Sequence, residues 1–106
     1  MTTIVNIGRN YKPDHETLGN MPLGSDHWLA FIESVESALL EQGGKDIHVF
    51  TGYSRYNGVG EDSASIQCFD DDDLDLYALK IMLRSLAWMY EQDSIALTTA
   101  PTEFVS

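Results

Sequence analysis

The residue types best suited to contacting a ligand are concentrated in the segment 53–61. Tyr53, Arg55 and Tyr56 lie close together in the chain, and Glu61 follows across a turn. Aromatic side chains and arginine are over-represented among the residues that carry binding energy. Alternation along a strand would place Tyr53 and Arg55 on one face, with Tyr56 close by. We therefore predict that these four residues contact a small molecule or a peptide; the alternative is cross-strand packing that stiffens a hairpin.

Four consecutive aspartates, Asp70, Asp71, Asp72 and Asp73, form a second cluster. Carboxylate oxygens ligate calcium and magnesium, but the run lacks the spaced ligands and the glycine of a calcium loop. Carboxylates are also favoured where a helix begins, through capping and the helix dipole. The favoured interpretation is an acidic helix start at 70–73. The same row of charges could form an acidic surface that mimics nucleic-acid phosphates.

The other reactive residue types form no catalytic or metal-binding motif. His15, His27 and His48 are scattered without an HxxxH or HxH spacing, so no metal site is predicted. Cys68 is in phase with Ile66 along a predicted strand, which indicates buried filling rather than a nucleophile. No Ser/His/Asp motif or phosphate-binding glycine motif is present. The sequence therefore predicts a protein that is not an enzyme and that needs no cofactor.

Charge and composition limit the classes of partner. The chain has 106 residues, of which 43% are hydrophobic, and a formal net charge of −11. Nucleic acids and anionic membranes should be repelled, whereas a basic protein surface would be attracted. A single cysteine fits a reducing compartment, and neither a signal peptide nor a membrane span is predicted. We expect a cytoplasmic protein with a protein partner, or alternatively a small-molecule ligand.

Turn residues and hydrophobic spacing predict six elements. A β-branched run predicts a first strand at 2–8, and the long loop 9–24 contains Pro13 and Pro22. Ser25 is expected to cap a first helix that ends at Gly43-Gly44. The remaining elements are expected to be strands at 47–53 and 63–69 joined by a hairpin tip at 53–61, a second helix from about 74 to 92, and a strand at 94–99.

Each predicted helix has an apolar stripe at three-and-four spacing. The first stripe contains Trp28, Phe31, Ile32, Val35 and Leu39; the second contains Leu76, Leu79, Leu83, Leu86 and Tyr90. Ile81, Met82, Trp88 and Met89 fall outside the second stripe. The second helix is therefore apolar around more of its circumference than one sheet can cover, which predicts a homodimer.

The element order predicts one α+β domain over 1–106. It is the ferredoxin-like β-α-β-β-α-β arrangement, a four-stranded antiparallel sheet with two helices on one face. We expect the first and third strands to lie side by side and parallel in the middle. One pole would then gather Arg9, the long loop, Ser25, Lys45 and 70–73, and the opposite pole would hold the hairpin tip 53–61 and the C-terminal tail from about Thr99.

Several short motifs resemble small uncharacterised proteins of actinobacterial bacteriophages. They are NIGRN at 6–10, Trp28 with Phe31, Gly60-Glu61-Asp62-Ser63, and the segment 92–97. The resemblance spans most of the chain and implies a phage-encoded accessory protein in the cytoplasm of an infected bacterium. It brings no catalytic or binding residues.

Three functional hypotheses follow. The first is a non-enzymatic accessory protein that binds a host or phage protein, through an acidic surface that imitates nucleic acid. The second is a protein that binds or sequesters a small molecule such as a nucleotide signal, near Tyr53, Arg55 and Tyr56. The third is a small dimeric enzyme, for which fold analogy is the only support.

Overall fold

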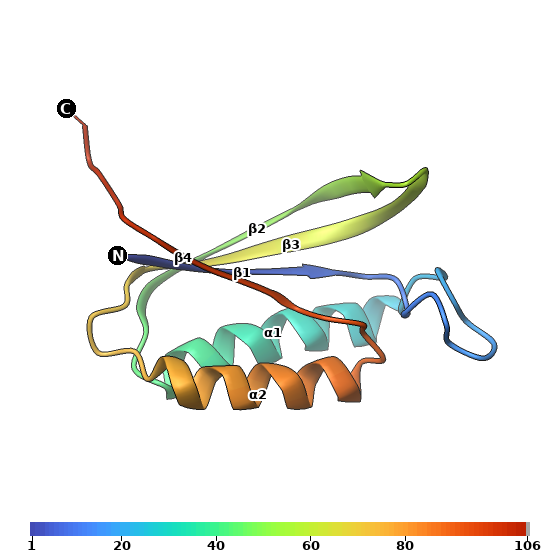
Figure 1. The fold of residues 1–106 in the computed structure, drawn as a ribbon, viewed down its shortest axis with the longest axis horizontal. Helices are drawn as coiled ribbons and strands as arrows, with labels where there is room; N and C mark the ends of the chain where they lie inside the picture. The colour runs from blue at the N-terminus through green and yellow to red at the C-terminus, as the bar shows by residue number, and fades with distance from the viewer. Residues whose placement is uncertain (106) are drawn as a thin grey trace.

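The computed structural model describes residues 1–105, without the side chain of Tyr56. It confirms the predicted α+β order β-α-β-β-α-β, with a sheet of four strands on one side and both helices beneath it (Figure 1). The elements are β1 (Thr2–Gly8), α1 (Ser25–Glu41), β2 (Lys45–Tyr56), β3 (Val59–Asp70), α2 (Leu76–Met89) and β4 (Ala96–Ala100).

The strand order is β2-β3-β1-β4, and every neighbouring pair is antiparallel. The prediction that the first and third strands are central is confirmed, but the prediction that they run parallel is wrong. Helix α1 carries the chain back beneath the sheet, so β2 runs in the same direction as β1 (Figure 1). The hairpin then reverses the chain, and β3 pairs antiparallel with β1.

The β2–β3 hairpin is longer than the apolar runs that predicted it. Its ladder continues to the pair Tyr56 and Val59, so most of the predicted tip 53–61 is strand. Asn57 and Gly58 form the turn with φ values of 50° and 79°. Positive φ at both positions is the requirement of a type I′ turn, which matches the twist of the flanking strands. Because the turn is tight, the backbone pairing of β2 with β3 continues through polar residues up to the turn.

Helix α1 ends as predicted but begins differently. Gly43 adopts a left-handed φ of 99°, and the Gly44 N–H donates to the Leu39 carbonyl at 2.8 Å. Ser25 is the first helical residue rather than the cap, and the preceding Gly24 makes no side-chain capping bond. The Ser25 hydroxyl instead accepts a 3.5 Å hydrogen bond from Arg9.

Helix α2 is capped by Asp75, not by the run 70–73. The Asp75 carboxylate accepts a 3.0 Å hydrogen bond from the Ala78 N–H, and the first turn contains no acidic residue. The predicted acidic helix start is therefore displaced. Asp71 and Asp73 make other contacts, because a short turn separates the end of β3 from the helix.

The core lies between the sheet and the helices. Val5 of β1 and Ile66 of β3 are fully buried, as are Phe31, Leu39 and Leu79 of the helices. The predicted stripes form this layer, with Trp28, Leu76, Leu86 and Tyr90 packed partly buried against it. Within the described residues, neither helix is long and apolar enough to cross a bilayer.

The two ends of the molecule differ from the predicted poles. What we call the loop end contains the 9–24 loop, the start of α1 and the hairpin turn; Arg9 reaches Asp62 and Asn10 reaches Gly60 there. What we call the aspartate end contains residues 70–75, the chain start and the C-terminal tail (Figure 1). The loop therefore lies with the hairpin turn, and the tail lies with the aspartates, because all strands alternate in direction.

Candidate functional site

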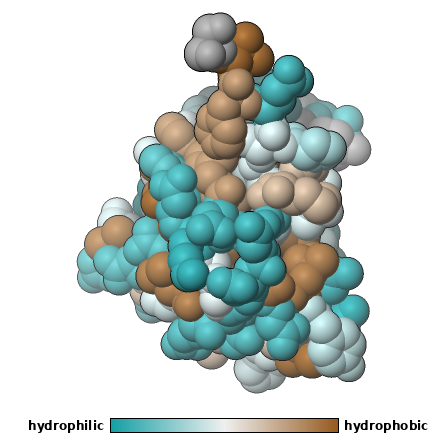
Figure 2. Space-filling model, turned by 90° about the vertical axis from the view of Figure 1, so that its left-hand side faces the viewer, coloured by the Kyte–Doolittle hydropathy of each residue, from teal (hydrophilic) through white to brown (hydrophobic). Residues whose placement is uncertain are grey.

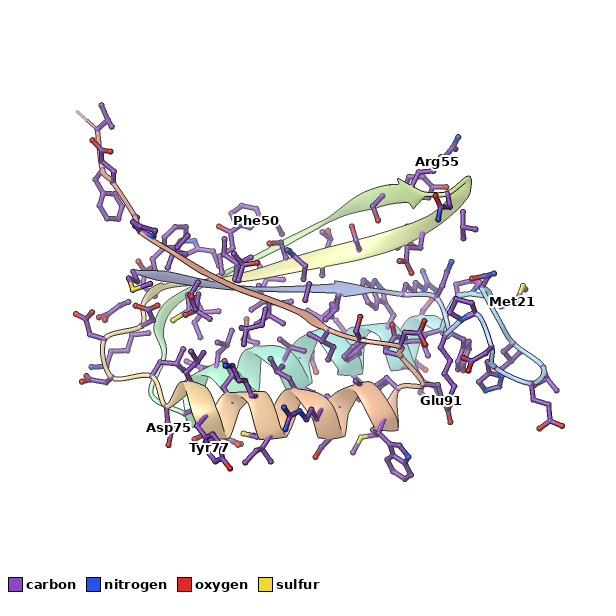
Figure 3. All side chains as sticks on the ribbon, viewed as in Figure 1. Met21, Phe50, Arg55, Asp75, Tyr77 and Glu91 are labelled. Atoms are coloured by element: carbon purple, nitrogen blue, oxygen red, sulfur yellow. The ribbon has the colours of Figure 1, made fainter. Side chains whose placement is uncertain are left out.

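The sheet face opposite the helices is open and has a floor of very small residues. Gly8 of β1 pairs with Ser63 of β3, and Ser63 pairs with Gly52 of β2, so the three lie in one row across the sheet. The next row contains Asn6, Ser65 and Phe50. A hollow of about 490 Å³ lies over these rows. Phe50 rises beside it, pointing away from the helices (Figure 3).

Glu61 lies where this hollow meets a second one. The second hollow, of about 510 Å³, lies at the loop end and is lined by polar groups that include Asn20, Asn57 and Gln92. Glu61 and Gly8 line both hollows. The carboxylate is therefore the one acidic group shared by the open sheet face and the loop end.

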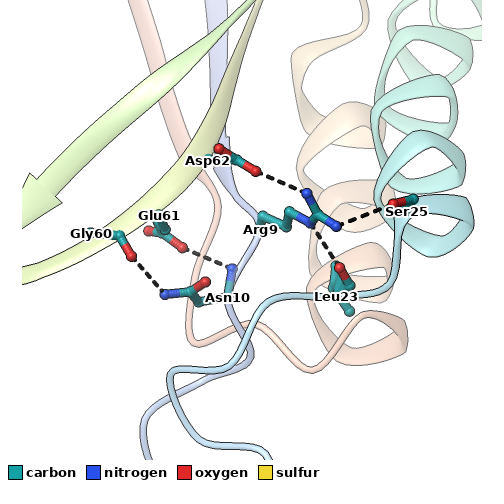
Figure 4. Close-up of polar contacts among 7 residues, drawn as sticks. All are labelled: Arg9, Asn10, Leu23, Ser25, Gly60, Glu61 and Asp62. Atoms are coloured by element: carbon teal, nitrogen blue, oxygen red, sulfur yellow. Dashed lines mark hydrogen bonds and ion pairs between the residues drawn. The ribbon is translucent and has the colours of Figure 1, made fainter.

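The position of the Glu61 carboxylate is set by the first residues of the long loop. The Asn10 N–H donates to Glu61 Oε2 at 2.9 Å, and Asn10 Nδ2 donates to the Gly60 carbonyl at 3.3 Å (Figure 4). Gln92 Nε2 donates to the Asn10 carbonyl at 3.0 Å. A Cβ at Gly8 would collide with the Glu61 carboxylate, so only glycine leaves room for it.

Arg9 supports the same region from the helix side of the sheet. Its guanidinium donates to Asp62 at 2.9 Å and to the Leu23 carbonyl at 2.7 Å (Figure 4). Because Arg9 and Asp62 lie on the face opposite Gly8 and Glu61, this ion pair fastens the loop without entering the hollow. Its role is structural.

Three of the four predicted contact residues have described side chains, and these three do not form one cluster. Tyr53 pairs with Asp62, and Ser54 pairs with Glu61, so alternation places Tyr53 and Glu61 on opposite faces of the hairpin. The Tyr53 ring crosses β3 at Gly60, where a Cβ would meet its hydroxyl, while Tyr53 also borders the open-face hollow. Arg55 points away from the rest of the molecule (Figure 3). The side chain of Tyr56 lies outside the described residues.

The sequence analysis missed Gly8, Gly52, Ser63 and Asn10 as site residues. A signal was present, because Gly52 is in phase with Ser54 and Ser63 is in phase with Ser65, which leaves small side chains on one strand face beyond Phe50. Glycine within a strand often marks the close approach of a ligand or of another segment. The pairing that brings Gly8 beside them depends on the strand order, which a local pattern does not contain.

The aspartate run is divided between bound and exposed side chains. Asp71 accepts a 2.8 Å hydrogen bond from Thr3 Oγ1, and Asp73 pairs with Lys45 at 3.2 Å. The Asp73 hydrogen bond and charge, followed by the charge of Asp70, raise the pKa of Lys45. Hydrophilic side chains gather on this end of the molecule (Figure 2). Binding of a basic protein by this surface stays a prediction.

No group of three or more His, Cys, Asp or Glu side chains among the described residues is placed to hold a metal ion. His15 Nδ1 instead accepts from the backbone N–H of Leu18 at 3.0 Å, and His48 contacts Asp46 at 2.8 Å.

Cys68 is fully buried, as the alternation with Ile66 predicted. Its Sγ lies 3.3 Å from the Lys45 carbonyl oxygen and 3.2 Å from the Asp70 carbonyl oxygen, and either oxygen can accept a hydrogen bond from the thiol. Burial raises the pKa of this thiol. A buried thiol that keeps its proton is unsuited to nucleophilic attack.

Comparison with known proteins gives structural likeness without sequence likeness. No family model and no curated protein sequence matches the chain. A phage SAM lyase solved in complex with S-methyl-5′-thioadenosine is similar at TM-score 0.54 and 16% identity, covering 91% of this chain and 76% of the lyase chain. A phage SAM lyase in the apo state gives TM-score 0.53 and 15% identity, covering 99% and 91%.

A de novo designed protein, Foldit4, has TM-score 0.49 and 12% identity over 97% of this chain and all of its own. At these identities the likeness to the two lyase structures shows a shared fold. The chain therefore has an α+β fold that occurs among phage SAM lyases.

Proposed function

We propose that this chain binds a small, neutral or cationic molecule of the nucleoside-thioether or sulfonium class on the open sheet face beside Glu61. The observation that carries the proposal is the row Gly8, Ser63 and Gly52, which ends at a carboxylate held by the Asn10 N–H at 2.9 Å. This arrangement provides a smooth floor and one oriented acceptor. A hollow with a few precisely placed polar groups is typical of ligand sites.

The floor suits a planar group. A Cβ at Gly52 would have no atom within 4 Å, so open space lies directly above that residue. Phe50, which is 52% exposed, stands at the side of the hollow and offers an aromatic face. Aromatic rings stabilise a stacked or edge-on planar ligand beyond simple area burial. A purine base would fit this chemistry.

The carboxylate selects the charge of the ligand. Among the described residues, the Glu61 side chain receives one hydrogen bond, at Oε2, which leaves Oε1 to accept from a ligand. Glu61 lies in a chain of net charge −11, whose field attracts cations and repels phosphates. The negative charge therefore disfavours a nucleotide signal that carries phosphates, which was the small-molecule ligand suggested by the sequence.

The structural likeness supports the same class of compound. One of the similar lyases was solved with S-methyl-5′-thioadenosine, a neutral nucleoside thioether, and both lyases are named for SAM, a sulfonium cation. Neither compound carries a phosphate. Their charge therefore agrees with what the Glu61 region of this chain would accept.

A thermal-shift titration with S-methyl-5′-thioadenosine, SAM and ATP tests the proposal. A ligand at 100 times its dissociation constant stabilises the folded state by about 2.7 kcal/mol, which raises the melting temperature of a domain of this size by roughly 10 °C or more. We expect stabilisation by the first two compounds and none by ATP. No shift with either of them at millimolar concentration would remove the proposal.

The same mixtures distinguish binding from cleavage. After incubation, chromatography shows whether SAM is recovered intact. We propose a binding protein and expect intact SAM. Recovery of a nucleoside thioether released from SAM would show that the site belongs to an enzyme. The proposed location of the ligand would not change.

A further inference from the structure

The outward face of α2 is aromatic and basic although it faces solvent. Tyr77, Ile81, Arg84 and Trp88 follow one another at intervals of four, three and four residues, so they share one stripe. Tyr77 is 77% exposed and Trp88 is 83% exposed. Figure 3 shows Tyr77 pointing away from the sheet. Tyrosine, tryptophan and arginine are the residues most enriched where binding energy is concentrated.

The outward face of α1, beside it, is acidic. Glu33 and Glu41 are exposed and line a groove of about 530 Å³ between the two helices. On the α2 side the groove is bordered by Ile81 and Met82. The α1 side of the groove therefore carries negative charge, and the α2 side carries apolar side chains.

We propose that this helix layer binds a second copy of the same chain. A twofold axis parallel to the helices would set α1 of each copy over α2 of the other. Arg84 and Lys80 would then face Glu33 and Glu41 of the partner copy, while Trp88 and Tyr77 would cover the groove. Each contact would be made twice.

The basic residues of α2 and the acidic residues of α1 indicate that the partner on this helix layer is a second copy of the chain. Arg9, Lys12 and Lys45 already pair with carboxylates of their own chain. Among the described residues, Lys80 and Arg84 form no ion pair within 4 Å and lie four residues apart on α2. A second copy supplies the carboxylates that these cations lack, and it also supplies the cations that the α1 carboxylates lack. A second copy therefore complements both helices without a further partner.

The proposed dimer leaves the ligand site free. The helices cover one sheet face (Figure 1). The hollow above Gly8, Ser63 and Gly52 is on the other face. Dimerisation and ligand binding can therefore be measured separately, and the failure of one would not affect the other.

Sedimentation equilibrium of the full chain tests the proposal. The concentrations should run from about 1 to 500 μM, because an interface at the small end of the usual size range binds weakly. We expect the mass to rise from 11.9 kDa toward twice that value. Trp88→Ala, Arg84→Glu and Glu33→Arg should each lower the dimer affinity about tenfold, since removing an aromatic anchor or placing like charges opposite each other costs about 1.4 kcal/mol.

The double variant Glu33→Arg with Arg84→Glu identifies the partner helix. It restores opposite charges between α1 of one copy and α2 of the other, so it should recover most of the affinity that each single change removes. A chain that stays monomeric at every concentration would overturn the proposal. So would a dimer that is unaffected by the single changes, or a double variant that is no better than either single variant. All three positions are exposed, and far-UV circular dichroism confirms that each variant is folded.

Discussion

The backbone N–H of Asn10 donates a 2.9 Å hydrogen bond to the carboxylate of Glu61, fifty-one residues further along the chain. This bond ties the first turn of the long loop to the edge of the β2–β3 hairpin. It fixes one carboxylate oxygen of Glu61. The start of the long loop therefore positions a hairpin residue.

Removing the charge of Glu61 should weaken the binding of a cationic ligand. Glu61→Gln keeps the acceptor for Asn10 and nearly the same volume, so we expect little change in stability. A charged hydrogen bond contributes about 1.5–3 kcal/mol, so affinity for SAM should fall by roughly tenfold or more, whereas affinity for the neutral thioether should fall less. Isothermal titration calorimetry measures both. Asp72→Asn, which removes an equal charge at the aspartate end, should leave both affinities nearly unchanged.

A larger side chain at position 52 should block the floor of the site. The Cβ of Gly52→Val would enter open space, and valine is favoured in strands, so the fold should be retained. Ligand binding should fall below detection in the same calorimeter. Thr51→Val is the matched control. The side chain at position 51 projects from the other face of β2, and threonine and valine have nearly the same shape. Undiminished binding by the Gly52 variant would place the ligand elsewhere.

Alanine at position 8 should destabilise the fold. Its Cβ would collide with the end of the Glu61 side chain, which would have to move away from the Asn10 N–H, and losing that part-buried hydrogen bond costs about 1 kcal/mol. Urea unfolding measures the difference in the free energy of unfolding. Gly24→Ala is the comparison, because a Cβ there would meet nothing within 4 Å and should change stability by about 0.5 kcal/mol or less. Equal effects at the two glycines would contradict the proposed packing of Glu61.

The start of α2 should depend on Asp75 rather than on the run before it. Asp75→Ala removes the acceptor of the Ala78 N–H, so we expect a loss of about 1 kcal/mol. Asp72→Ala removes an exposed carboxylate and should cost roughly nothing measurable. Thermal and urea unfolding of the two variants decide the matter. A larger effect at Asp72 would revive the capping role predicted for the run 70–73.

The buried thiol should make stability depend on pH in the alkaline range. Burial raises the folded-state pKa of Cys68 above its value in the unfolded chain, so the folded state binds this proton more tightly. The resulting contribution is fully present below the unfolded pKa of about 8.5 and is lost as pH rises through the folded value. The free energy of unfolding of the wild type, relative to Cys68→Ala, should therefore decrease above about pH 9. A difference that stays constant would contradict this.

The sequence predicted the fold well because each element has a strong local signal. The stripe that includes Phe31 and Val35 and the turn Asn57-Gly58 determine their elements almost independently of the rest of the chain. The helix caps were harder, since Ser25 and Asp75 both lie among other good capping residues. Only the geometry of the turn after β3 selects Asp75.

The site was harder to predict because the register of strand pairing determines which of its residues lie together. Tyr53 and Glu61 are close in the chain, yet the pairing of Tyr53 with Asp62 sends them to opposite faces. Gly8 and Gly52 are distant in the chain, yet both pair with Ser63. A change of one residue in register would reverse every such relationship, and no local pattern fixes it.

The most direct test is a titration of isotope-labelled protein with S-methyl-5′-thioadenosine, the compound bound in one of the similar structures, followed through its backbone amide NMR signals. The account predicts the largest shifts at Gly8, Gly52, Glu61 and Ser63, with α2 and the aspartate end nearly unchanged. Shifts confined to the helices or to residues 70–75, or no shifts at millimolar ligand, would contradict it.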